Sequence, residues 1–217
     1  MWDMDGTLVD TEPHWMNAQR RLAATHGIVW TDEDNLKVVG QSMEFVAKTL
    51  QQSGVEQPTL EIIRSLVEDV AATIQTKIPW LPCAELLLSD LARSGVPCAL
   101  VTMAHTPIPH LVAAAAIPGA FAAVIAGDDV ARGKPDPEPY LTAARRLKVE
   151  PTHCVAVEDS LSGTLSAESA GMAVVVVPGV VSVPPSPGRH FVRSLADLSV
   201  EKLREIVDVS RPADNSR

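Results

Sequence analysis

The sequence predicts an α/β fold in which a doubly wound parallel sheet carries an inserted, all-helical segment. Short apolar runs alternate with segments of helical spacing from about residue 81 onward, the pattern of a sheet covered by helices on both faces. Residues 13–80 contain helical patterns and no convincing strand. We therefore expect an α/β core formed by residues 1–12 and 81–217, with residues 13–80 as a helical cap insert.

The elements expected in the core are four strands and the helices between them. Each strand candidate is apolar at successive positions, which indicates burial on both faces. The expected strands are 96–102, 122–127, 153–159 and 172–178, and the expected helices are 85–95, 107–116, 137–147 and 161–171. In the insert we expect helices at 13–27, 42–54 and 58–77, and we expect the tail 210–217 to be frayed.

Composition excludes several classes of function. The chain has 217 residues, 46% of them hydrophobic, and a net charge of −9 without a cluster of Lys and Arg, so nucleic-acid binding is not expected. The longest uncharged run, 111–127, is broken by Pro118 and Gly119, which argues against a membrane span. No secretory signal is evident, and the three cysteines (Cys83, Cys98 and Cys154) are widely spaced. We expect a cytoplasmic monomer with reduced, buried cysteines.

The first candidate for chemistry is a pair of carboxylates close to the start of the chain. Asp3 and Asp5 flank one residue and run directly into Gly6 and Thr7. A D-x-D pair is often a solvated turn, but at the end of a central strand it would lie at the ligand-binding edge of the sheet. Like charge and a shared metal would then give the two carboxylates different protonation roles.

Three further strand ends carry polar groups. Thr102 ends the run 96–102, Lys134 stands in the rigid segment Gly-Lys-Pro-Asp-Pro, and Glu158 and Asp159 end the run 153–159. Paired acids suit a hard cation such as Mg²⁺, and Ser160 is a candidate helix N-cap. Because the carboxyl ends of parallel strands share one edge, the four ends together could bind Mg²⁺ and a phosphate beside a nucleophilic carboxylate.

With these motifs in this order, the sequence resembles the haloacid dehalogenase-type hydrolase superfamily. The resemblance rests on "DMDGTLVDTEP", "LVTMA", "GKPDPEPY" and "VEDSLSG". The similar branch has a helical cap and includes phosphoglycolate phosphatase-like and β-phosphoglucomutase-like proteins. It implies a Mg²⁺-dependent phosphatase that acts on a small phosphorylated metabolite through an aspartyl-phosphate.

The resemblance also implies roles for the individual residues. Asp3 would be the nucleophile, and Asp5 would be the general acid and base. Thr102 and Lys134 would hold phosphoryl oxygens. Mg²⁺ would bind Asp3, the Asp5 backbone carbonyl, Asp159 and, directly or indirectly, Glu158.

Two alternatives to a phosphatase remain open: a β-phosphoglucomutase-like phosphosugar mutase and a non-catalytic protein that binds a phosphate ligand. The mutase-like pattern has an arginine in the cap where this chain has Met43, and Lys37 or Lys48 could replace it. Gln41, Ser42 and Met43 are candidates for contacting a less charged leaving group. His14 is a further substrate candidate, although a surface position is favoured for it.

The support beneath Asp3 is unusually short. Only Met1 and Trp2 precede it, where a central strand would contain several apolar residues. We therefore hypothesise that the natural start lies upstream, or that the chain was trimmed.

Overall fold

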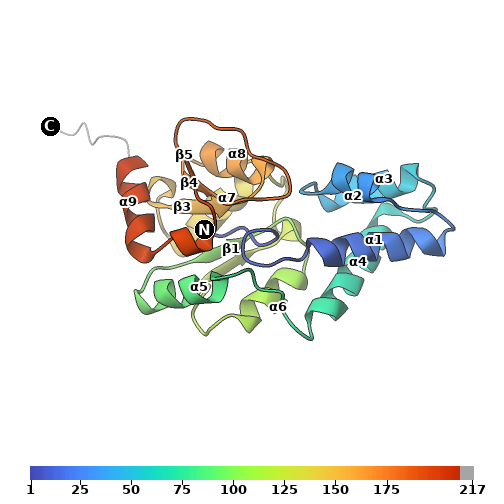
Figure 1. Ribbon diagram of the computed structural model, residues 1–217, viewed down its shortest axis with the longest axis horizontal. Coiled ribbons are helices and arrows are strands. Elements are labelled where there is room, and N and C mark those ends of the chain that lie inside the picture. The colour runs from blue at the N-terminus through green and yellow to red at the C-terminus, as the bar shows by residue number, and fades with distance from the viewer. Residues whose placement is uncertain (211–217) are drawn as a thin grey trace.

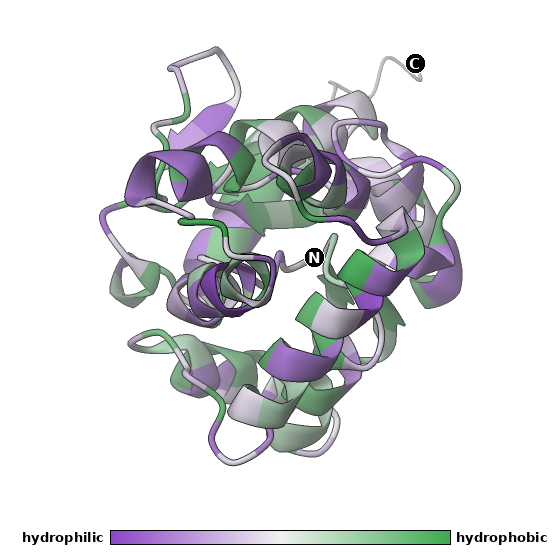
Figure 2. Ribbon diagram, turned by 90° about the vertical axis from the view of Figure 1, so that its right-hand side faces the viewer, coloured by the Kyte–Doolittle hydropathy of each residue, from purple (hydrophilic) through white to green (hydrophobic). Residues whose placement is uncertain are grey.

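Short parallel strands form the centre of the molecule in the computed structural model, which describes residues 1–210. The strands pair in parallel as β1 with β2, β3 with β4, and β4 with β5. Their bounds are β1 (Ala99–Val101), β2 (Ala123–Ile125), β3 (Val155–Glu158), β4 (Ala173–Val176) and β5 (Arg189–Phe191). In Figure 2 the central strands are largely hydrophobic, whereas the surrounding helices carry both hydrophobic and hydrophilic residues.

Residues 1–3 join the two groups of strands into one sheet. Trp2 forms parallel bridges to Leu100 of β1 and to Val157 of β3. The Trp2 N–H donates to Ala99 O at 2.9 Å, and the Asp3 N–H donates to Val157 O at 3.0 Å. The sheet order is therefore β2, β1, residue 2, β3, β4, β5, and Asp3 follows directly at the carboxyl edge.

The core helices cover both faces of this sheet. Alternate strand residues belong to two separate hydrophobic clusters, with Leu100 and Val157 in one and Val101 and Ala156 in the other. The first cluster includes side chains of α5 (Ala84–Arg93), α6 (Ile108–Ala115) and α9 (Val200–Ser210), and the second those of α7 (Glu138–Leu147) and α8 (Leu161–Ser169). This confirms the doubly wound parallel α/β fold.

Four further helices, which we call the helical cap, are grouped at one end of the molecule (Figure 1). They are α1 (Glu12–Thr25), α2 (Asp32–Val38), α3 (Met43–Gln52) and α4 (Thr59–Ile74). The helix α4 packs against α1 and α3, using a stripe of buried residues that includes Ile62, Leu66, Val70 and Ile74. Thr31 caps α2 through a capping box, and Ser42 caps α3 by accepting the Phe45 N–H.

The structure adds elements that the sequence patterns did not indicate. The helices α2 and α9 and the strand β5 lie outside the predicted elements, and the strands are shorter than the apolar runs. The cap helices fall within residues 12–74, and the domain limits 12/13 and 80/81 stay a prediction. Ser210 ends α9, while the rest of the predicted frayed tail, 211–217, lies outside the described residues. Among the described residues, no helix combines the length and the apolar character needed to cross a bilayer.

The cysteine prediction holds for two of the three residues. All three thiols are free, and Cys98 and Cys154 are buried. Cys83 is exposed, so the expectation of a buried side chain was wrong there. Cys83 immediately precedes α5 and has a backbone φ of 68°. Its side chain is not among the buried residues on the packed face of that helix.

The position of Trp2 yields a test of the sheet. Its side chain is 2% exposed in the larger hydrophobic cluster, so Trp2→Ala should lower the free energy of unfolding by about 3–5 kcal/mol. Urea denaturation measures this change. Leu60→Ala, at a residue that is 79% exposed, is the control and should change it by less than about 0.5 kcal/mol. A loss below about 1 kcal/mol for Trp2→Ala would contradict the central position of this residue.

Candidate active site

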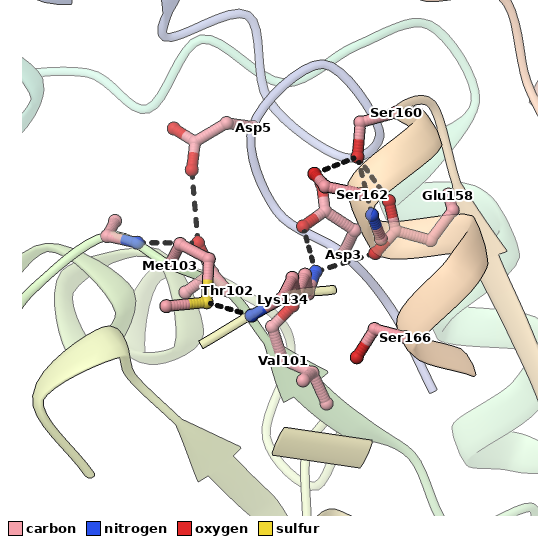
Figure 3. A network of polar contacts seen from close by, with 12 residues as sticks. Asp3, Asp5, Val101, Thr102, Met103, Lys134, Glu158, Ser160, Ser162 and Ser166 are labelled. Carbon is pink, nitrogen blue, oxygen red and sulfur yellow. Dashed lines mark hydrogen bonds and ion pairs between the residues drawn. The ribbon is translucent and has the colours of Figure 1, made fainter. Parts of the chain in front are cut away.

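The Lys134 ammonium lies between two carboxylates at the carboxyl edge of the sheet (Figure 3). Its Nζ is 2.6 Å from Asp3 Oδ1, 2.6 Å from Glu158 Oε1 and 2.9 Å from Val101 O. Burial opposes the charge, but the Asp3 and Glu158 carboxylates outweigh it and hold the pKa of Lys134 above its usual range. The lysine therefore remains a fixed cation beside the predicted nucleophile.

Glu158 is the buried anchor of this cluster. It is 0% exposed and, besides the Lys134 ammonium, accepts hydrogen bonds from the Tyr140 hydroxyl at 2.5 Å and the Ser160 hydroxyl at 3.1 Å. Gly163 leaves the room for it, because a Cβ at this position would fall 2.0 Å from the carboxylate. The Ser160 hydroxyl also accepts the Gly163 N–H at 3.1 Å, which confirms Ser160 as the N-cap of α8.

Asp159 completes a carboxylate cluster. Asp3, Glu158 and Asp159 each offer an oxygen, and the three oxygens lie within 4.8 Å of one another. Asp159 lies in a cradle formed by two glycines, since a Cβ on Gly6 or Gly179 would come within 2.2 or 2.8 Å of its Oδ2. Burial, followed by the charge of Glu158, raises the pKa of Asp159 to about 7 and raises that of Asp3 well above its ordinary value.

These groups fit a hard divalent cation. Three carboxylates face one ammonium, so the cluster carries an excess of negative charge in a buried place. Oxygen donors at this spacing suit Mg²⁺, and a divalent charge would favour the ionised carboxylates. Asp3 and Asp159 would hold the metal, and Glu158 is the third donor within reach.

Asp5 is held by donors other than the lysine. Its Oδ2 accepts the Thr102 hydroxyl at 3.1 Å, and its Oδ1 accepts the Trp15 indole N–H at 3.2 Å and the Thr11 hydroxyl. Thr102 in turn accepts the Ala104 N–H at 3.0 Å. Trp15 lies in the first turn of α1 and Thr11 is the N-cap residue of that helix, so the entry to the cap orients the carboxyl group of Asp5 directly.

A cavity of about 860 Å³ connects this cluster to the cap. Asp3, Asp5, Thr102, Lys134 and Asp159 form its inner end, and Glu158 lies behind them, buried. Of the four substrate candidates, Gln41 and Met43 line the cavity. Ser42 and His14 are not among the lining residues, and Ser42 instead caps α3.

Several residues that position the site are not among those predicted from the sequence. Tyr140 on α7 and Thr11 before α1 gave no readable signal, because the direction of a lone side chain depends on packing. Trp15 is buried in the hydrophobic core, and its indole also reaches Asp5. Gly163, four residues after Asp159, was a usable signal of close packing.

Comparison with known proteins finds similarity over most of this chain. Residues 1–177 match the family described as haloacid dehalogenase-like hydrolase. Hexitol phosphatase A of Escherichia coli is 32% identical over 187 residues, which cover 85% of this chain and 84% of that protein. A bifunctional riboflavin kinase/FMN phosphatase of Arabidopsis thaliana is 28% identical over 92% of this chain, and the chain spans only 54% of its length.

Solved structures share the fold. The crystal structure of CbbY from Rhodobacter sphaeroides in complex with phosphate has a TM-score of 0.82 and 29% sequence identity. The match covers 93% of this chain and 96% of that chain, so it includes both the α/β core and the helical cap.

The Lys134 contacts predict a stability effect. Lys134→Met leaves the buried Glu158 carboxylate without its cation, so the free energy of unfolding in metal-free buffer should fall by about 3–5 kcal/mol. Adding Glu158→Gln to this variant should restore part of the loss, because the buried charge is removed as well. Urea denaturation measures both, with the exposed Lys48→Met as control. Equal stability of Lys134→Met and the control would refute the buried cluster.

Proposed function

We propose that this chain, which belongs to the haloacid dehalogenase-like hydrolase family, is a Mg²⁺-dependent phosphatase of a small phosphorylated metabolite. Its family and its phosphatase relatives make it a phosphoric monoester hydrolase. The observation that carries the proposal is the contact of Lys134 with Asp3 inside the carboxylate cluster, with Asp5 held by separate donors nearby.

Asp3 is the nucleophile in this proposal. Its carboxylate oxygen attacks phosphorus in line with the ester oxygen, a phosphorus–oxygen bond to Asp3 forms, and the bond to the leaving alcohol breaks. The Lys134 ammonium, 2.6 Å from Asp3 Oδ1, lies where it can offset the charge of the nucleophile and of the phosphoryl oxygens. The product of this step is an aspartyl-phosphate.

Asp5 moves the protons in both halves of the reaction. As an acid it gives its proton to the departing alkoxide, and as a base it then takes a proton from the water that attacks the aspartyl-phosphate. Attack of water on phosphorus releases inorganic phosphate and returns Asp3 to its carboxylate form. The Thr102 and Trp15 donors hold the Asp5 carboxyl in a fixed orientation for these transfers.

A bound Mg²⁺ would supply charge neutralisation and would orient a phosphoryl oxygen beside Asp3. Asp3, Asp159 and Glu158 are the carboxylates that fit it. This role explains how a buried Asp3, whose pKa is raised by burial and by Glu158, would stay ionised as a nucleophile.

The cap supports a phosphatase over a mutase. Met43 lines the cavity and stands where the mutase-like sequence pattern has an arginine. The thioether of a methionine cannot form an ion pair with a second phosphate. Lys37 and Lys48 are absent from the cavity lining, and Lys37 pairs with Asp34 at 2.7 Å on the surface. A protein that only binds phosphate would not need Asp5 held by three donors in addition to the nucleophile cluster.

The nucleophile is tested by Asp3→Asn. Hydrolysis of p-nitrophenyl phosphate with Mg²⁺ should fall at least about a thousandfold, because an amide cannot form the covalent intermediate. Asp32→Asn, at an exposed cap residue outside the cavity, is the control and should keep wild-type turnover. Wild-type-like turnover by Asp3→Asn would remove the proposed nucleophile.

The metal is tested by thermal unfolding without substrate. Millimolar Mg²⁺ should raise the melting temperature of the wild type by about 5 °C, because it binds the folded cluster and not the unfolded chain. Asp159→Asn should lose most of this shift, and Asp32→Asn should keep it. No shift in the wild type, or an unchanged shift in Asp159→Asn, would contradict the proposed ligands.

A further inference from the structure

The outer half of the cavity differs chemically from the inner half. The inner half holds the carboxylates and the lysine, and the outer half is bounded by the cap helices and by the loop after β4. Because the phosphate monoester must place its phosphorus beside Asp3, the outer half is where the leaving alcohol would lie. Its walls therefore determine which alcohols are accepted.

The charge of the lining disfavours a second anionic group. Lys134 is the only lysine or arginine among the described residues that line the cavity, and its ammonium already contacts Asp3 and Glu158. The carboxylates of the lining are Asp3, Asp5, Asp10, Glu12 and Asp159. A leaving group with a second phosphate would find no free cation in this lining.

Both the cap and the core contribute exposed apolar side chains to the cavity lining. Leu36 of the cap lines the cavity and is 61% exposed, and Val180 and Val181 of the core line it as well and are 58% and 56% exposed. Leu161 and Leu165 of α8 extend the same surface. Large apolar side chains gathered in this way around a site indicate a ligand that covers them.

One polar group in this wall lacks a partner. Gln19 lines the cavity and is 5% exposed, and its Oε1 is buried without a hydrogen-bond partner among the described residues. It follows Trp15 by four residues on α1, so it lies one turn beyond the indole that holds Asp5. A buried amide oxygen without a donor is unfavourable, and a hydroxyl group of the ligand would satisfy it.

We infer that the outer cavity selects the monophosphate ester of an uncharged alcohol that has an apolar portion and a further hydroxyl group, which donates to Gln19 Oε1. This inference rests on the proposed phosphatase function, and it names the class of leaving group. Gln19 is a specificity-determining residue in this account, and the apolar residues Leu36, Val180 and Val181 contact the carbon skeleton.

The test uses three matched sets of substrates with three to six carbons: alkyl phosphates, ω-hydroxyalkyl phosphates and α,ω-alkanediol bisphosphates. Within a chain length they differ only in the far end of the leaving group. For the wild type, kcat/KM for the best ω-hydroxyalkyl phosphate should exceed that of the matching alkyl phosphate about two- to tenfold, the effect of one hydrogen bond. The matching bisphosphate should be at least tenfold poorer than the alkyl phosphate.

Two variants and one control variant assign the substrate preference to residues of the cavity. Gln19→Leu should lose the preference for the hydroxyl group, whereas Gln57→Leu should keep it. Gln57 is the matched control because it also has a buried, unpartnered Oε1 but lies outside the cavity. Leu36→Arg places a cation at the exposed rim and should raise the ratio of bisphosphate to alkyl phosphate turnover at least tenfold.

Failure of this inference is distinguishable from failure of the proposed function. Equal use of bisphosphates and alkyl phosphates by the wild type, or a hydroxyl preference that persists in Gln19→Leu, would overturn the inference. So would the absence of any alkyl phosphate turnover by an enzyme that hydrolyses p-nitrophenyl phosphate with Mg²⁺. If instead Asp3→Asn hydrolyses p-nitrophenyl phosphate like the wild type, the proposed function itself is wrong.

Discussion

Backbone hydrogen bonds on both sides of residues 1–3 hold the sheet and the candidate site together. The Val101 N–H donates to Trp2 O at 2.8 Å on one side, and the Val157 N–H donates to Met1 O at 3.0 Å on the other. Without these bonds, β1 and β3 would have no common neighbour. The same bonds fix the position of Asp3 at the edge of the sheet. One set of hydrogen bonds therefore both keeps the sheet continuous and positions the proposed nucleophile. The side chain of Trp2 strengthens it by filling the core beneath.

The site concentrates charge where a core would otherwise be apolar. Asp3, Glu158 and Lys134 are nearly inaccessible to solvent, and burial of such groups is unfavourable unless each is paired. The pairing is incomplete because carboxylates outnumber the ammonium. Burial, followed by the charge of Glu158, therefore raises the pKa of both Asp3 and Asp159. Natural proteins accept such unfavourable clusters at functional sites. In this account a divalent cation and a phosphate complete the balance of charge.

The fold and the inner site were largely readable from the sequence, and the outer site was not. Runs that are apolar at successive positions identified β1 to β4. Polar groups after these strands converge at one edge of the sheet, because the carboxyl ends of parallel strands share that edge. The strand β5, with the sequence Arg-His-Phe, carries no such pattern, and its place follows from pairing with β4. Tyr140, Trp15 and Gln19 lie on helices, where packing alone decides which side chain reaches the cavity. The mutase alternative likewise needed the structure, which shows that Lys37 and Lys48 do not line the cavity.

The central claim is that Asp3 carries the phosphoryl group and that Asp5 then activates water. The most direct measurement uses Asp5→Asn with p-nitrophenyl phosphate and Mg²⁺, because nitrophenolate leaves without help from an acid. The account predicts a stoichiometric burst of nitrophenolate without turnover, and mass spectrometry of the acid-quenched protein should find the phosphoryl group on Asp3. Continued turnover without an adduct, or a phosphoryl group on another residue, would contradict the account.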